Sequence, residues 1–157
     1  MGGKALACRT GHAYFKQMMR EHNAIYGGEM SAHHYFRDFS YCDTGMLAWL
    51  AVVAELSASG ERLADVLEAR IAAFPCSGEI NFTVDDAKAA QERVAEHFQS
   101  LNPKLETVDG LGMDFGDWRF NLRASNTEPL LRLNVETRAN QKLLDERVAE
   151  ISKLITG

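Results

Sequence analysis

Two runs of strictly alternating apolar and polar residues constrain the fold of this chain more than any other feature of its sequence. The apolar positions are Trp118, Phe120 and Leu122 in the first run and Leu131, Leu133 and Val135 in the second. Successive side chains of a strand point to opposite faces, so each run predicts a β-strand with one buried face. Gly116 and Asp117, ahead of the first run, form a two-residue hairpin signal, and we therefore expect an antiparallel sheet.

Two amphipathic helices are expected to cover one face of this sheet. Their apolar stripes are Ala87, Ala90, Val94 and Phe98 in the first helix and Leu144, Val148, Ile151 and Ile155 in the second. Further short strands are predicted at 80–84, 105–108 and 113–115. Residues 75–157 therefore predict an α+β domain with an antiparallel sheet and two helices on one side.

The first half, residues 1–74, is expected to be a partial α/β domain that ends before Pro75. Short strands are predicted at 4–8 and 24–26, and helices at 10–20, 44–56 and 63–74. The helix at 44–56, which Asp43 or Thr44 can cap, is apolar almost all round, so we expect it to be deeply buried. Because few strands are available to cover it, the first half resembles the end of a larger domain.

Composition and charge argue against several functional classes. The chain has 17 basic and 22 acidic residues, a net charge of −5, which argues against non-specific nucleic-acid binding. Its longest apolar run, residues 46–54, is too short to cross a bilayer. The cysteines at 8, 42 and 76 form no Cys-x-x-Cys pair and favour reduced thiols in the cytoplasm. We expect a small-molecule ligand and no nucleic-acid or membrane partner.

The segment 123–129, Arg-Ala-Ser-Asn-Thr-Glu-Pro, joins the two alternating strands and is rich in hydrogen-bond donors. The guanidinium of Arg123, the hydroxyls of Ser125 and Thr127, the amide of Asn126 and the backbone N–H groups are the donors that a phosphate needs. An ordinary β-turn explains the Ser, Asn and Pro residues equally well, so the chemistry alone leaves both interpretations open.

A second polar segment, Gly28-Glu-Met-Ser-Ala-His33, has sugar-binding chemistry. Glu29 can accept hydrogen bonds from sugar hydroxyls, and Ser31, two residues on, lies on the same side if the segment is extended. A surface turn with incidental polar residues is the alternative, and the residues alone favour it.

The histidines suggest no metal site from their spacing. His33 and His34 are adjacent and point apart on a strand, with no cysteine or carboxylate at ligand spacing. The segment Arg9-Thr-Gly-His12 precedes a helix and can hold an anion or a proton-transfer group. A capped helix start with a solvated histidine explains the same residues.

Taken together and in this order, the segments 9–12, 28–33 and 123–129 resemble the C-terminal part of bacterial phosphomannomutases of the α-D-phosphohexomutase superfamily. The resemblance implies that residues 1–74 are the C-terminal portion of domain 3, with its sugar-recognition loop. Residues 75–157 would be domain 4, a TATA-box-binding-protein-like fold with a phosphate-binding loop. The phosphoserine and magnesium loops of that family belong to N-terminal domains, so the resemblance implies a fragment.

The family implies interconversion of mannose 6-phosphate and mannose 1-phosphate, a step toward GDP-mannose. The reaction proceeds through a phosphoserine form of the enzyme and a hexose 1,6-bisphosphate intermediate. The same bisphosphate is the activator. Mg²⁺ is expected to be held by a domain outside this chain. The implied substrate-binding residues are Arg9, Glu29, Ser31, Arg123, Ser125, Asn126 and Thr127, and the implied catalytic residues are His12 and His33. Alone, the chain is expected to bind a phosphosugar without turnover. A phosphoglucomutase of the same family, or a non-enzymatic anion- or protein-binding module, stays open as an alternative.

Overall fold

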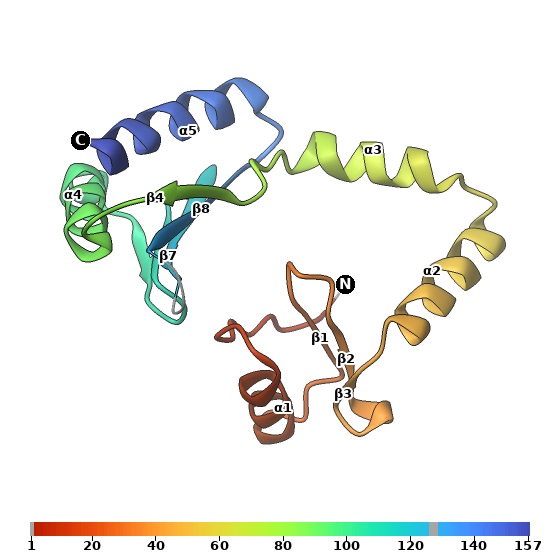
Figure 1. Ribbon diagram of the computed structural model, residues 1–157. Helices are drawn as coiled ribbons and strands as arrows, with labels where there is room; N and C mark the ends of the chain where they lie inside the picture. Colours follow the sequence, from red (N-terminus) through yellow and green to blue (C-terminus); the bar gives the residue numbers. More distant parts are fainter. Residues whose placement is uncertain (1, 126–128) are drawn as a thin grey trace. The chain divides into compact units, whose positions relative to one another are not determined.

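The computed structural model describes residues 2–125 and 129–157, and the chain divides into two compact units (Figure 1). Unit 1 comprises Met1–Val66 and unit 2 comprises Leu67–Gly157. Within the described residues, no helix is both long enough and apolar enough to cross a membrane.

Unit 1 contains a small antiparallel sheet in the order β1-β2-β3. Its elements are α1 (His12–Glu21), β1 (Tyr26–Gly28), β2 (His34–Phe36), the 3-10 turn η1 (Arg37–Phe39), β3 (Cys42–Asp43) and α2 (Gly45–Ser59). The helix α3 (Leu63–Ala73) starts in unit 1 and ends in unit 2. The strand predicted at residues 4–8 is wrong, because residues 2–9 form neither helix nor strand. A short apolar run forms a strand only where a partner strand pairs with its backbone, and the run itself does not show whether such a partner is present.

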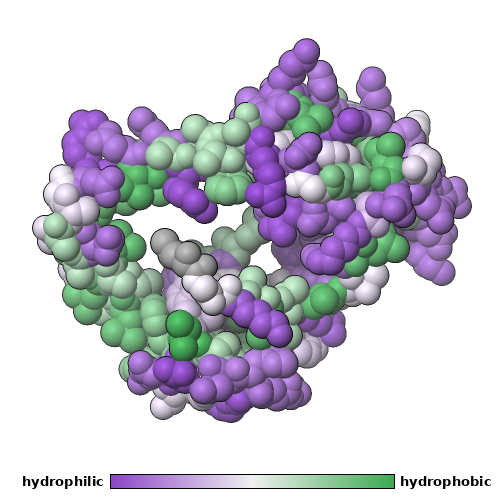
Figure 2. All heavy atoms as spheres, turned by 180° about the vertical axis from the view of Figure 1, so that it is seen from behind, coloured by the Kyte–Doolittle hydropathy of each residue, from purple (hydrophilic) through white to green (hydrophobic). Residues whose placement is uncertain are grey.

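The deep burial expected for the helix at 44–56 is also wrong. The helix forms as α2, yet none of its side chains is buried, and Trp49 is 58% exposed. Figure 2 shows apolar surface over this part of the chain, on the left of the view. An apolar helix is buried only when neighbouring elements cover it, and periodicity within the helix carries no information about those neighbours.

Unit 2 is the predicted α+β domain. Its elements are β4 (Ile80–Thr83), α4 (Ala87–Gln99), β5 (Lys104–Glu106), β6 (Leu111–Asp114), β7 (Trp118–Ala124), β8 (Leu130–Thr137) and α5 (Gln141–Thr156). The five strands pair antiparallel in the order β4-β8-β7-β6-β5. Both helices begin at side-chain caps: Asp86 accepts from the Ala89 N–H at 2.9 Å, and Asn140 accepts from the Leu143 N–H at 2.9 Å.

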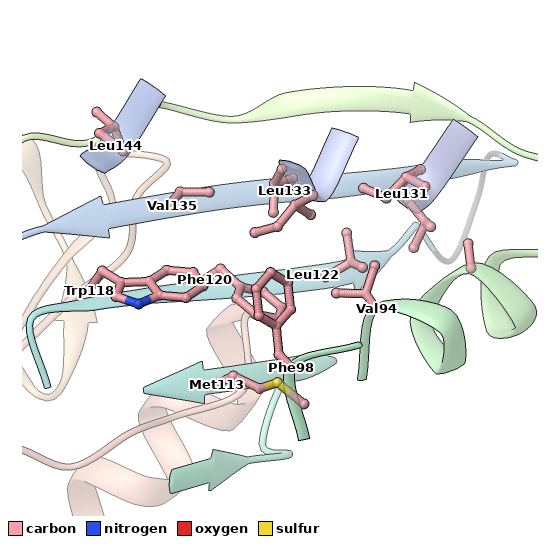
Figure 3. Close-up of a cluster of buried hydrophobic side chains, with 13 residues drawn as sticks. Val94, Phe98, Met113, Trp118, Phe120, Leu122, Leu131, Leu133, Val135 and Leu144 are labelled. Carbon is pink, nitrogen blue, oxygen red and sulfur yellow. The ribbon is translucent and has the colours of Figure 1, made fainter. Parts of the chain in front are cut away.

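The apolar face of the sheet packs against α4 and α5 and forms the core of unit 2. Figure 3 shows side chains of β6, β7 and β8 meeting those of α4 and α5. All six apolar positions of the two alternating runs are buried, so the predicted inward faces of β7 and β8 are confirmed. Phe98 of α4 lies at the centre, with ring-centroid distances of 5.4 Å to Trp118 and 5.8 Å to Phe120. The opposite residues of β7 therefore lie on the uncovered, polar face.

Candidate functional site

The polar segment of unit 1 forms the turn of the β1–β2 hairpin. Gly28 pairs with His34 in the hairpin register, so residues 29–33 close it. The Glu29 N–H donates to the His33 carbonyl at 3.0 Å, and the Ala32 N–H donates to the Glu29 carbonyl at 3.1 Å. The segment is therefore a turn, as the alternative interpretation of the sequence expected, and Ser31 is exposed in it. A turn of this kind presents polar groups to a ligand from a fixed frame.

The Glu29 carboxylate is held by two donors from other elements. One oxygen accepts from the Gly11 N–H at 2.8 Å, and the other accepts from the Tyr35 hydroxyl at 2.7 Å. Gly11 caps the N-terminus of α1, whose partial positive charge favours a carboxylate there. Burial and then the bond to Glu29 raise the pKa of Tyr35, so this hydroxyl stays a donor. A carboxylate offers about four acceptor sites, so Glu29 can also accept from a ligand hydroxyl.

Asp43 on β3 binds two consecutive residues of the hairpin. Its Oδ2 lies 2.7 Å from Nδ1 of His33, and its Oδ1 accepts from the His34 N–H at 2.8 Å. These hydrogen bonds, from His33 first and then His34, lower the pKa of Asp43 below its usual range. The N-cap of α2 is Thr44, without a side-chain cap bond, so the Asp43 carboxylate serves the hairpin instead of the helix.

His12 and Arg9 lie at the start of α1. The His12 ring packs edge-on against His33 at 4.7 Å and against Tyr35 at 5.2 Å between centroids. Its Nε2 lies 4.0 Å from Oδ2 of Asp43. The Arg9 guanidinium lies over the Tyr14 ring, 4.8 Å from its centroid. The structure therefore gathers His12 with the hairpin residues, whereas Arg9 stacks on an exposed aromatic ring.

His12, Glu29 and His33 each offer one atom that could bind a metal ion, and these three atoms lie within 4.8 Å of one another. Two imidazoles and a carboxylate suit a transition metal such as zinc. They do not suit Mg²⁺, which prefers an octahedron of oxygen ligands. This cluster therefore does not fit Mg²⁺, which the resemblance places in a domain outside this chain.

In unit 2, Arg123 lies on the polar face near the end of β7. It is directly opposite Arg132 of β8, an arrangement of like charges that is unfavourable unless acids offset it. Glu79 lies 3.7 Å from both guanidinium groups, and Asp109 lies 3.6 Å from Arg123. These distances exceed the usual N–H···O range of about 2.7–3.2 Å, so the acids form ion pairs that leave donor directions of Arg123 available to an anion.

Ser125 follows directly after β7, and its N–H donates to the Leu130 carbonyl at 2.8 Å. Asn126 and Thr127, the other predicted phosphate ligands, lie outside the described residues. Gly110 packs against this strand with φ of +84°, and a Cβ there would lie 2.7 Å from the Leu122 carbonyl oxygen. Gly110 thus packs closely against the backbone of Leu122 and Arg123, where a side chain would not fit.

Four partners of the site residues were not identified from the sequence: Tyr35, Asp43, Glu79 and Asp109. Only Tyr35 has a sequence signal, because it is two residues after His33 and so points to the same side of a strand. The other three reach the sites through tertiary contacts. In the cluster of His12, Glu29 and His33, the last two belong to one segment but His12 comes from another, so the spacing within one segment did not indicate it.

Two family profiles match the chain. The profile for phosphoglucomutase/phosphomannomutase, alpha/beta/alpha domain III, matches residues 1–74. The profile for the phosphoglucomutase/phosphomannomutase C-terminal domain matches residues 79–154. The two profiles therefore meet near the residues where unit 2 begins its sheet.

Curated relatives match along nearly the whole chain. A protein named "Phosphohexose mutases" from Xanthomonas campestris pv. campestris (strain B100) is 60% identical over 156 residues, covering 99% of this chain and 35% of that protein. A phosphomannomutase of Salmonella montevideo is 51% identical, covering 99% of this chain and 34% of that protein. The chain thus spans about a third of the length of these relatives.

A crystal structure supports the fold. A phosphoglucomutase/phosphomannomutase family protein from Burkholderia thailandensis superimposes with a TM-score of 0.74 at 23% identity. The match covers 99% of this chain and 33% of that one. At this level of identity the likeness concerns the fold alone.

Proposed function

Because the chain belongs to the phosphoglucomutase/phosphomannomutase family, we propose that its two polar segments, 28–33 and 123–129, are the sugar-binding and phosphate-binding parts of a phosphomannomutase. Residues 1–74 would be the C-terminal portion of domain III, and residues 75–157 the C-terminal domain. The observation that carries the proposal is that the charged residue of each family-like motif is held by partners: Glu29 by Gly11 and Tyr35 in unit 1, and Arg123 by Glu79 and Asp109 in unit 2.

The proposed reaction interconverts mannose 6-phosphate and mannose 1-phosphate through a hexose 1,6-bisphosphate. Relatives named phosphomannomutase, such as the one from Salmonella montevideo, support mannose over glucose as the sugar. The whole enzyme would supply a phosphoserine from another part of its chain. Residues of this chain would bind the substrate and move protons.

The site residues would have separate roles in binding the sugar, binding the phosphate and transferring protons. Glu29 would accept hydrogen bonds from sugar hydroxyls, beside the exposed Ser31. Arg123, with Ser125, Asn126 and Thr127, would bind the phosphate that is not being transferred, and Arg9 would add a phosphate contact. His12 and His33 would exchange protons with the reacting hydroxyl. Binding energy at the remote phosphate positions the reacting end of the sugar.

The proposal is tested by titrating the 157-residue chain with mannose 1-phosphate while recording amide NMR spectra. We expect the signals of Glu29, Ser31 and Ser125 to shift. Replacing Arg123 by Gln should weaken binding by roughly tenfold or more, because a hydrogen bond to a charged group contributes about 1.5–3 kcal/mol. Glucose 1-phosphate and inorganic phosphate, titrated separately, report sugar selectivity.

Arg119→Gln is the matched control. Arg119 lies on the same strand and the same face as Arg123, but it is near the other end of the strand and pairs with Glu136 at 2.8 Å. We expect this variant to bind mannose 1-phosphate as the native chain does. Equal weakening in both variants, or unmoved signals at millimolar ligand, would contradict the proposal. Equal binding of inorganic phosphate and mannose 1-phosphate would indicate a simple anion-binding module.

A further inference from the structure

The contact between His33 and Asp43 determines which imidazole nitrogen carries the proton. Nδ1 of His33 lies 2.7 Å from Oδ2 of Asp43, a hydrogen-bond distance. An ionised carboxylate can only accept hydrogen bonds, so the imidazole nitrogen that faces it must donate. In the neutral ring the proton is then on Nδ1, and Nε2 carries the lone pair.

Backbone contacts around Asp43 help to hold its carboxylate toward His33. Asp43 pairs with Tyr35 in the register of β2 and β3, and the Thr44 N–H donates to the His34 carbonyl at 2.9 Å. The second carboxylate oxygen is occupied by the His34 N–H at 2.8 Å. The two oxygens therefore have distinct partners, and the carboxylate is held in one orientation.

The His33 ring is restrained on a second side. His12 packs edge-on against it at 4.7 Å between centroids. The side chain of His33 is nevertheless 42% exposed, and no described residue has a hydrogen bond to its Nε2. The nitrogen opposite Asp43 is thus the one that can meet a ligand.

We propose that Asp43 is a positioning residue that fixes the tautomer of His33, so that Nε2 is the nitrogen that exchanges a proton with the sugar. The part of this proposal that concerns the sugar rests on the proposed function above. When a sugar hydroxyl oxygen attacks the phosphorus of the phosphoserine of the whole enzyme, the new O–P bond would form as the bond from phosphorus to the serine oxygen breaks. The hydroxyl proton would move to the Nε2 lone pair, and the departing serine oxygen would take a proton from water. The resulting imidazolium keeps its Nδ1–H bonded to Asp43, and the proton returns to the sugar oxygen when the reaction reverses.

Asp43→Asn offers a specific test, because it should invert the tautomer without removing the hydrogen bond. The His34 N–H needs an acceptor, so the amide oxygen of the new side chain should take the place of Oδ1. The amide NH₂ then faces Nδ1 of His33 as a donor. His33 can accept this bond only with its lone pair on Nδ1 and its proton on Nε2.

The measurement is ¹⁵N NMR of the imidazole nitrogens in the 157-residue chain near pH 8.5, about two units above the ordinary histidine pKa of about 6.5. We expect the native chain to show protonated Nδ1 and unprotonated Nε2 at His33, and Asp43→Asn to show the reverse. Asp38→Asn is the matched control, because Asp38 is 90% exposed and pairs with Arg37, and it should leave His33 unchanged.

A native His33 protonated on Nε2 would overturn the proposal, and this result needs no variant to fold. An unchanged Nδ1–H in Asp43→Asn, with the amide spectrum of unit 1 retained, would also overturn it. The experiment uses no phosphosugar, so its outcome is independent of whether the chain binds mannose 1-phosphate.

Discussion

Single residues at both candidate sites are held in place by partners that come from other segments. Glu29 accepts from the backbone of Gly11, 18 residues away, and Arg123 lies between Glu79 and Asp109. Groups that are already oriented lose less conformational entropy on binding, which favours affinity for a small anionic ligand. The partners of these residues therefore determine how Glu29 and Arg123 are oriented at the candidate sites.

Two glycines with similar backbone angles allow a test of the close packing beneath Arg123. Gly110 has φ of +84° and Gly116 has φ of +89°, but only at Gly110 would a Cβ meet backbone atoms. Both alanine variants incur the cost of positive φ, about 1–2 kcal/mol. We expect Gly110→Ala to lose at least about 1 kcal/mol more than Gly116→Ala, because the Leu122 and Arg123 backbone must move.

The measurement is urea unfolding followed by circular dichroism. Equal losses of unfolding free energy in the two variants would show that the backbone beside Gly110 adapts readily. In that case the close packing would contribute nothing to the placement of Arg123.

At the scale of elements, α2 differs most from the rest of the chain. Its apolar side chains run all round the helix, yet Met46, Trp49 and Leu50 are 64%, 58% and 48% exposed. Water contact with such a surface is unfavourable by about 25 cal/mol per Å² of apolar area. Large exposed apolar patches commonly mark sites of association.

We therefore expect the 157-residue chain to self-associate as its concentration rises. Replacing Met46 and Leu50, one helical turn apart, by lysine should shift the chain toward monomer in sedimentation velocity experiments. Leu101→Lys is the control, because Leu101 is 55% exposed but lies outside α2, and this variant should associate as the native chain does. A native chain that stays monomeric at high concentration would contradict the expectation.

At the scale of the whole molecule, the chain comprises two units, and the cluster of buried side chains around Phe98 lies entirely in unit 2. Among the described residues, none from unit 1 belongs to that cluster, and this includes the fully buried Tyr35. We therefore do not expect a loss of packing around Phe98 to remove the contacts of Tyr35 in unit 1.

Phe98→Ala should destabilise unit 2 by about 3–5 kcal/mol, because it removes a fully buried ring from the centre of the core. We expect the amide signals of unit 2 to report this loss in urea, while those of His33 and Tyr35 keep their native midpoint. Phe98→Leu, a milder change, should act in the same direction. Lys88→Ala, exposed on the same helix, should change stability by less than about 0.5 kcal/mol. A common shift of both units would show that they unfold as one.

The sequence by itself determined the sheet and helices of unit 2, the inward faces of β7 and β8, and the order of the two polar motifs. These features depend on local periodicity, caps and turn residues, which act over a few neighbouring positions. The tertiary structure alone decided that Asp43 binds His33 instead of capping α2, that Glu79 and Asp109 flank Arg123, and that α2 is exposed. Those outcomes depend on which distant segments meet, and no pattern within one segment contains that information.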